Sequence, residues 1–150
     1  NGLLKLNEIY SRDAIVLVHD GVRPLINAET ISNNIECAKE NGNAITVAPV
    51  VETIIVKTET NFVGEIIDRS MISVAKAPQC FILGDIVDAH RRAEKDNVTN
   101  MIDSASLMKH YGAHLHMVEG PIENIKITTP IDFYTFRAIM DAKENLQIFG

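Results

Sequence analysis

The sequence has few cysteines, a deficit of basic residues and no long apolar run, and each shortage excludes a class of protein. Fourteen basic residues stand against twenty acidic ones, giving a formal net charge of -6, which argues against general binding to nucleic acids or anionic membranes. No apolar run is long enough to span a membrane, and the first residues lack the basic and apolar regions of a secretion signal. We therefore expect a cytoplasmic protein with no nucleic-acid or membrane partner.

Sequence patterns for several kinds of active site are also missing. Cys37 and Cys80 are isolated along the chain, which favours free thiols in a reducing compartment over a metal site. The sequence contains no Gly-x-Ser-x-Gly or His-Glu-x-x-His pattern, which weakens hydrolase and metalloprotease interpretations. His114 and His116 alternate onto one strand face, but no third ligand is nearby in the sequence, so a zinc site is not expected.

The 150 residues suit one domain with a sizeable core. Apolar runs predict strands that are covered on both faces, as in parallel sheets. Helices are predicted between them from capping residues, from an asparagine-glycine stop and from a proline at the start of the last helix. The predicted strands are 14–18, 44–50, 115–118 and 125–128, and the predicted helices begin after Asn27, at about Gly84, after Asp103 and at Thr129-Pro130. This alternation predicts an α/β fold with a mostly parallel sheet flanked by helices, forming a single domain over residues 1–150.

One stretch departs from this alternation. In residues 53–67, the segments TIIVK and FVGEII flank the polar TETN, which is typical of a β-hairpin. An isolated hairpin is only marginally stable, so we expect this arm, residues 52–70, to pack against another surface such as a second copy of the chain.

The beginning of the sequence is unusual. Leu3, Leu4 and Leu6 are typical of the interior of a helix whose beginning is absent. An α/β nucleotide-binding domain usually has its first strand and phosphate loop before such a point, yet no glycine-rich loop of either common type occurs here. We therefore expect the chain to be incomplete.

Charged residues follow the first predicted strand in the segment IVLVHDGVRP. In open α/β sheets, ligands bind beyond the carboxyl ends of strands. Asp20 could hold a magnesium ion or bond to its own turn. Arg23 could bind a phosphate or form a structural salt bridge. The residues alone leave both alternatives open.

A second candidate segment is NIKITT. Lys126 could present an ammonium to a phosphate at a strand end, although a solvated lysine is the more common case. Thr53 and Arg69 bracket the arm, where Arg69 could bind a ligand or form an ion pair. Asp103 is explained by helix capping.

Several segments occur together in an order and spacing that resembles one known family: HDGVRP, VVETII, IDRS, APQCF, MIDSASLM and NIKITTPID. The family is that of the 2-C-methyl-D-erythritol 4-phosphate cytidylyltransferases, which includes the ribitol-5-phosphate cytidylyltransferases. The resemblance runs from Asn1 to about Lys143 and matches the carboxyl-terminal two thirds of such an enzyme. It implies a Rossmann-like nucleotidyltransferase fold that lacks its amino-terminal portion and nucleotide loop, and a chain that is inactive alone.

The resemblance also implies a reaction and its residues. The reaction is transfer of a cytidylyl group from CTP to a sugar-alcohol phosphate, with Mg2+ as cofactor and pyrophosphate as product. Asp20 matches the catalytic, metal-binding aspartate, Lys126 the catalytic lysine near the phosphates, and Arg23 a substrate-binding residue. Thr53 and Arg69 match arm residues that reach the acceptor phosphate in the neighbouring subunit's site, which implies a homodimer. The hypothesis requires Asp20 and Lys126 to meet at one phosphate pocket.

Some positions depart from the family pattern. Ala77 stands where the family commonly has threonine, and Ile102-Asp103-Ser104 replaces the common Thr-Asp followed by an acid. These changes leave the acceptor open, although Val22 favours the ribitol-phosphate branch and an alditol phosphate. The alternative function is a non-catalytic α/β dimerisation or assembly module, in which the charged residues only stabilise turns.

Overall fold

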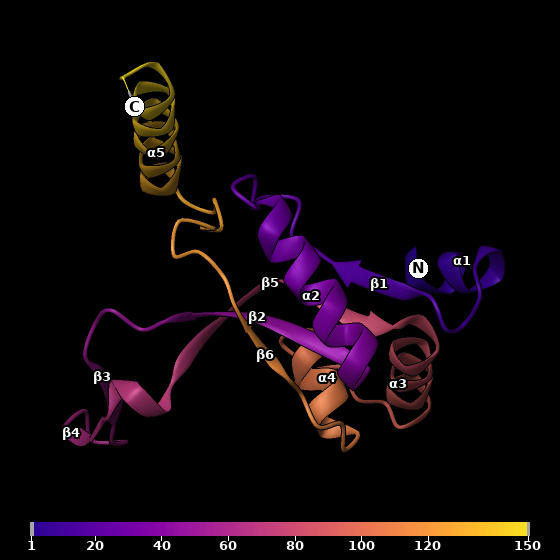
Figure 1. Cartoon of the computed structure of the whole chain (residues 1–150). Helices are drawn as coiled ribbons and strands as arrows, with labels where there is room; N and C mark the ends of the chain where they lie inside the picture. The colour runs from indigo at the N-terminus through magenta and orange to yellow at the C-terminus, as the bar shows by residue number, and fades with distance from the viewer. Residues whose placement is uncertain (1, 150) are drawn as a thin grey trace.

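The computed structural model describes residues 2–149 and contains a four-stranded sheet, a separate two-stranded hairpin and flanking helices (Figure 1). The sheet order is β1-β5-β2-β6, with β1 at Ile15–Val18, β2 at Asn43–Pro49, β5 at Ser73–Ile82 and β6 at Met117–Glu119. Strand β5 is antiparallel to both β1 and β2, whereas β2 and β6 are parallel. Three of the four strands therefore run in one direction, and the predicted α/β class is confirmed.

The sequence analysis missed β5, which is the longest strand with 10 residues. The proline inside it is the reason, because a proline cannot donate to a strand ladder and argues against a central strand. The register with β2 shifts between Ile45 and Val47, so Pro78 lies in an irregularity of the ladder. The Thr46 hydroxyl donates a 2.6 Å hydrogen bond to the carbonyl oxygen of Pro78 and fixes this part of β5.

Capping residues set the ends of the helices much as predicted. The Asn27 side chain accepts a hydrogen bond from the Thr30 amide at the start of α2, and Gly42 ends α2 in the left-handed region with φ 80°. Asp103 caps α4 in the same way. The helices are α1 Gly2–Ile9, α2 Ala28–Asn41, α3 Leu83–Lys95, α4 Ser104–His110 and α5 Pro130–Phe149, with a short 3-10 turn at Arg69–Met71.

Two predictions near the end of the sheet need correction. The strand expected at 115–118 is β6 at Met117–Glu119, and the strand expected at 125–128 is not a strand. Its backbone makes a hydrogen bond to a distant segment of the chain, from the Ile127 amide to the Val22 carbonyl at 2.9 Å. Thr128 and Thr129 instead donate to the Asp132 carboxylate at the start of α5. Capping of α5 therefore replaces strand pairing here.

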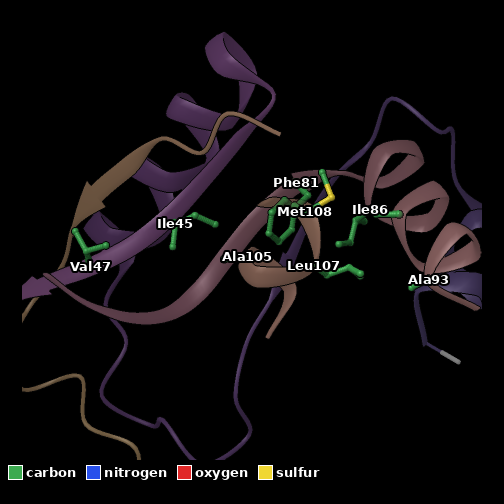
Figure 2. Close-up of a cluster of buried hydrophobic side chains, with 9 residues drawn as sticks. Ile45, Val47, Phe81, Ile86, Ala93, Ala105, Leu107 and Met108 are labelled. Carbon is green, nitrogen blue, oxygen red and sulfur yellow. The ribbon is translucent and has the colours of Figure 1, made fainter. Parts of the chain in front are cut away.

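Helices cover both faces of the sheet. Alternate strand residues point to opposite sides, so each face has its own cluster of apolar side chains. Figure 2 shows the larger cluster, in which side chains from β2, β5, α3 and α4 pack together. On the other face, Ala38 of α2 packs against Ala44 and Cys80. The larger cluster consists of Ile45, Val47, Phe81, Ile86, Ala89, Ala93, Ala105, Leu107 and Met108.

The predicted hairpin arm is confirmed, with β3 at Ile54–Lys57 paired antiparallel to β4 at Val63–Ile67. The arm and α5 both extend away from the sheet (Figure 1). Exposed apolar side chains of the arm are Ile54, Ile55, Val56, Phe62, Val63 and Ile66. Among residues 2–149, no helix combines the length and apolar character needed to cross a bilayer.

Gly120, just after β6, packs too closely against β2 to carry a side chain. A Cβ at this position would lie 2.6 Å from Cγ2 of the fully buried Thr46. We expect Gly120→Ala to lower the free energy of unfolding by about 1–3 kcal/mol through overpacking, measured by chemical denaturation. In Gly21→Ala the new Cβ would meet no atom within 4 Å, so its effect should stay within about 0.5 kcal/mol. Equal stability of the two variants would contradict the packing argument.

Candidate functional site

A cavity of about 330 Å³ lies where the end of β1, the middle of β5, the start of α4 and the segment before α5 come together. Its charged lining residues are Asp20, Arg23, Lys76, Asp103 and Lys126. The cavity follows the carboxyl end of β1, which is where ligands bind in open α/β sheets.

Asp20 and Lys126 meet in this cavity although they are far apart along the sequence. The Lys126 Nζ lies 3.2 Å from Asp20 Oδ1, and the Arg23 Nε lies 2.9 Å from Asp20 Oδ2. One carboxylate thus holds two cations from two different segments. The geometry that the catalytic hypothesis requires is present, while the roles assigned to these residues stay predictions.

The Asp20 carboxyl group is ionised at neutral pH. Partial burial raises its pKa, but the hydrogen bonds from Arg23 and Lys126, together with their positive charges, outweigh burial and hold the pKa below its ordinary value. The site therefore contains a carboxylate that accepts hydrogen bonds and can attract a cation.

Arg23 is mostly buried, with 12% of its side chain exposed. In addition to the contact with Asp20, its Nη1 donates to the Asn124 carbonyl at 2.8 Å. The Arg23 carbonyl in turn lies 2.9 Å from the His19 Nε2. These contacts show that Arg23 joins the loop after β1 to the segment that carries Lys126, so its salt bridge has a structural part whether or not it also binds substrate.

Asp103 brings a second carboxylate to the cavity. It caps α4 by accepting from the Ser106 amide at 2.8 Å, and it accepts from the Gln79 side chain at 2.7 Å. Burial raises the Asp103 pKa, but these hydrogen bonds outweigh burial and lower it overall. The Gln79 Oε1 also accepts from the Ala105 amide at 2.9 Å, so Gln79 ties α4 to β5.

The sequence analysis assigned no role to Lys76 or Gln79. Gln79 belongs to the APQCF segment, but its orientation could not be inferred without the strand that carries it. No sequence signal separates Lys76 from an ordinary solvated lysine. Both residues lie on β5 and line the cavity.

Thr53 and Arg69 do not line this cavity. Both are exposed, and they lie at the base of the arm. The Arg69 Nη1 donates to the Val51 carbonyl at 2.8 Å. Within one copy of the chain, the structure thus brings together Asp20, Arg23 and Lys126 but not the two arm residues.

The donor set of the cavity fits Mg2+ better than a transition metal. Two carboxylates, Asp20 and Asp103, line it, and Mg2+ is commonly held by one or two carboxylates with water and phosphate oxygens. Among the described residues, no group of three or more His, Cys, Asp or Glu side chains could enclose a metal ion. A magnesium site here would therefore need oxygens from a ligand or from water.

Comparisons with known proteins identify relatives of the chain. The family model described as IspD, 2-C-methyl-D-erythritol 4-phosphate cytidylyltransferase, matches residues 2–142. The chain is 52% identical over 150 residues to a ribitol-5-phosphate cytidylyltransferase of Vibrio parahaemolyticus, covering 100% of this chain and 63% of that protein. It is 38% identical over 133 residues to a 2-C-methyl-D-erythritol 4-phosphate cytidylyltransferase of Bacillus licheniformis, covering 89% of this chain and 57% of that protein.

Solved structures give the same result. The crystal structure of the Francisella tularensis 2-C-methyl-D-erythritol 4-phosphate cytidylyltransferase matches with a TM-score of 0.80 and 30% identity, covering 91% of this chain and 64% of that one. The crystal structure of the enzyme of the same name from Thermus thermophilus matches with a TM-score of 0.78 and 28% identity, covering 91% of this chain and 66% of that one. The chain thus spans between 57% and 66% of the length of these four relatives.

The contacts of Asp103 generate a stability prediction. Asp103→Ala removes the α4 cap and leaves the Gln79 amide without its acceptor, so we expect a loss of about 1–3 kcal/mol in the free energy of unfolding. Because the Asp103 pKa is lowered on folding, its contribution is present above the ordinary value of 3.8 and is lost as the pH falls through the folded value. Chemical denaturation across acidic pH should therefore give a shallower pH dependence for this variant than for the wild type.

The exposed Asp13 offers a matched control. Asp13→Ala should change the free energy of unfolding by less than about 0.5 kcal/mol. If both variants lose the same stability, or if Asp103→Ala keeps the acid dependence of the wild type, the capping argument is wrong.

Proposed function

The chain belongs to the 2-C-methyl-D-erythritol 4-phosphate cytidylyltransferase family, and from this membership we propose that it transfers a cytidylyl group from CTP to a sugar-alcohol phosphate and releases pyrophosphate. The observation that carries the proposal is the contact between Lys126 and Asp20 in a cavity next to Arg23. Because the chain spans 63% of the length of its Vibrio relative, we propose this activity for a polypeptide that also contains the remaining part of such an enzyme. We do not expect the 150 residues to turn over alone.

The proposed reaction joins two anionic phosphates. An oxygen of the acceptor phosphate attacks the α-phosphorus of CTP, a new P–O bond forms, and the bond to the bridging oxygen of the β-phosphate breaks to release pyrophosphate. The attacking phosphate is already anionic, so no general base is needed. Repulsion between the two phosphates is the main obstacle, and catalysis then depends on positioning and on cations.

The cavity offers groups that suit this task. Lys126 would stabilise the negative charge that develops at the α-phosphate. Asp20 would hold a magnesium ion, which when bound supplies further neutralisation of the phosphates. Arg23 would keep the Asp20 carboxylate in place through its 2.9 Å contact. Each role rests on the positions of these side chains around one cavity.

We propose an alditol phosphate, with ribitol 5-phosphate as the first candidate, for the acceptor. Two relatives of 52% and 48% identity, from Vibrio parahaemolyticus and Streptococcus agalactiae, are ribitol-5-phosphate cytidylyltransferases. The departures at Ala77, Ile102 and Ser104 all lie on the wall of the cavity, where they could distinguish acceptors.

We further propose that the chain forms a homodimer through the arm, which would bring Thr53 and Arg69 of one copy to the acceptor phosphate of the other. Support comes from the exposed apolar side chains of the arm, including Phe62 with 72% and Ile66 with 66% exposure. Two free cysteines among the described residues are consistent with a reducing compartment such as the cytoplasm.

Pyrophosphate release tests the proposed function. A longer version that carries the part of the relatives not matched here should release pyrophosphate from CTP and Mg2+ only when a suitable sugar-alcohol phosphate is added. Lys126→Ala should lower kcat by about a hundredfold or more, since it removes a charge aimed at the reacting phosphate, with little change in unfolding. Ribitol 5-phosphate and 2-C-methyl-D-erythritol 4-phosphate should be assayed side by side.

The exposed Lys109 on α4 serves as the control, and Lys109→Ala should keep wild-type turnover. Near-normal turnover of Lys126→Ala would refute the role of this lysine. If no acceptor supports pyrophosphate release and titration calorimetry detects no binding of CTP with Mg2+, the assembly-module alternative is favoured instead.

Sedimentation of the chain tests the proposed dimer. The wild type should sediment as a dimer, and Ile66→Ser on β4 should weaken association by about tenfold or more because it removes apolar area from both copies. Glu65→Gln, at the preceding position of the same strand and on its opposite face, should leave association unchanged. A monomeric wild type at working concentration would exclude a dimer formed by the arm.

A further inference from the structure

The segment that carries Lys126 has no regular secondary structure to hold it. Residues 120–129 lie between β6 and α5 and belong to neither. The Lys126 ammonium nevertheless lies 3.2 Å from Asp20 Oδ1. Other contacts must therefore fix the backbone of this segment.

Lys76 of β5 supplies two of these contacts. Its Nζ donates to the Ile122 carbonyl at 2.7 Å and to the Asn124 carbonyl at 3.2 Å. The Arg23 Nη1 donates to the same Asn124 carbonyl at 2.8 Å. One backbone oxygen, two residues before Lys126, thus receives hydrogen bonds from two cationic side chains.

The Asn124 side chain strengthens the same attachment. It is fully buried, and its amide donates to the Ala77 carbonyl at 2.8 Å. Lys76 and Ala77 are neighbours on β5, so two consecutive residues of this strand hold the segment. The 2.6 Å bond from Thr46 to the Pro78 carbonyl fixes β5 immediately afterwards. The segment is therefore anchored to the interior of the sheet.

Lys76 also borders the cavity, and it could instead bind a phosphate directly. Its ammonium has three donors, and two are used by backbone carbonyls. Burial lowers the Lys76 pKa, and the nearby positive charge of Arg23 lowers it further. A partly buried lysine whose donors already face carbonyl oxygens is better suited to hold the backbone than to bind an incoming anion.

We propose that Lys76 is a positioning residue, which clamps the 120–129 segment to β5 and so aims Lys126 at Asp20. The catalytic meaning of this clamp rests on the proposed function, but the clamp itself exists without turnover. Its loss should free the backbone around Lys126 while leaving the core of the sheet intact.

Hydrogen exchange of this chain, followed by mass spectrometry, tests the clamp. The most informative amide is that of Ile127, which donates to the Val22 carbonyl at 2.9 Å and joins the segment to the loop after β1. In Lys76→Met, peptides that contain Ile127 should exchange about tenfold faster or more, whereas peptides from α2 and β2 should exchange as in the wild type. Lys76→Arg keeps a cationic donor and should restore protection to within about twofold.

Lys109→Met, which removes an exposed lysine from α4, should leave all peptides unchanged. If Lys76→Met is too unstable to study, Lys76→Gln serves in its place, because its amide retains two donors and should give intermediate protection. Unchanged exchange around Ile127 in the neutral variant would overturn the proposal. Faster exchange throughout the sheet would also overturn it, since Lys76 would then be a general stabilising residue.

A turnover measurement separates this proposal from the proposed function. In a longer, active version of the protein, Lys76→Met should lower kcat by about tenfold while the KM for CTP changes by less than about threefold, and Lys76→Arg should recover most of kcat. Loss of protection without any cytidylyl transfer by the wild type would uphold the clamp and reject the enzyme. Wild-type kcat in Lys76→Met would reject the positioning of Lys126 by the clamp and leave the enzyme standing.

Discussion

The site depends on one constraint, which is that a segment without regular structure must hold an ammonium against a carboxylate on a different part of the chain. Strand β5 provides the fixed reference for this segment. It runs antiparallel between β1 and β2, so it lies beside the strand that leads to Asp20. Lys76 and Ala77 contact the segment before Lys126, while Gln79 contacts the start of α4. One central strand thereby sets the relative positions of three loops.

Local charge around the cavity differs from the charge of the whole chain. The sequence has a formal net charge of -6, yet three cationic side chains and two carboxylates face the cavity. Arg23 is mostly buried and Lys76 is partly buried, so their charges are less screened by solvent than those of surface lysines. An acidic protein can thus present a site suited to phosphates, because the local arrangement decides what binds there.

The parts of the fold that could be predicted from the sequence are those governed by local rules. Asn27, Gly42 and Asp103 marked helix ends because caps depend on neighbouring residues. The arm was recognisable from two apolar segments around a polar turn. Strand β5 was missed because its proline lies at an irregularity of the ladder, which arises only from pairing with β2. Residues 125–128 were misassigned as a strand because the hydrogen bonds to Asp132 at the start of α5 take the place of strand pairing.

The residues of the candidate site also divide into those that local sequence predicts and those that depend on distant contacts. Asp20 and Arg23 were expected at a ligand edge because they follow a buried strand. Lys126 was a candidate from its own segment, and the family resemblance assigned it the catalytic role. The contacts of Lys76, Gln79 and Asn124 depend on residues at least 24 positions away in the sequence. No pattern within a short window contains such information, so these supporting residues emerge only from the folded chain.

The pairing of Lys126 with Asp20 has a consequence for any anion that enters the cavity. The Lys126 ammonium already has a counter-ion at 3.2 Å, which limits the rotamers that its side chain samples. When a phosphate arrives, Lys126 would exchange one negative partner for another. Binding would therefore not have to order a free lysine side chain. The same exchange would leave Asp20 Oδ1 free to bind a cation. Entry of the anion and opening of a cation-binding position would then be one coupled event.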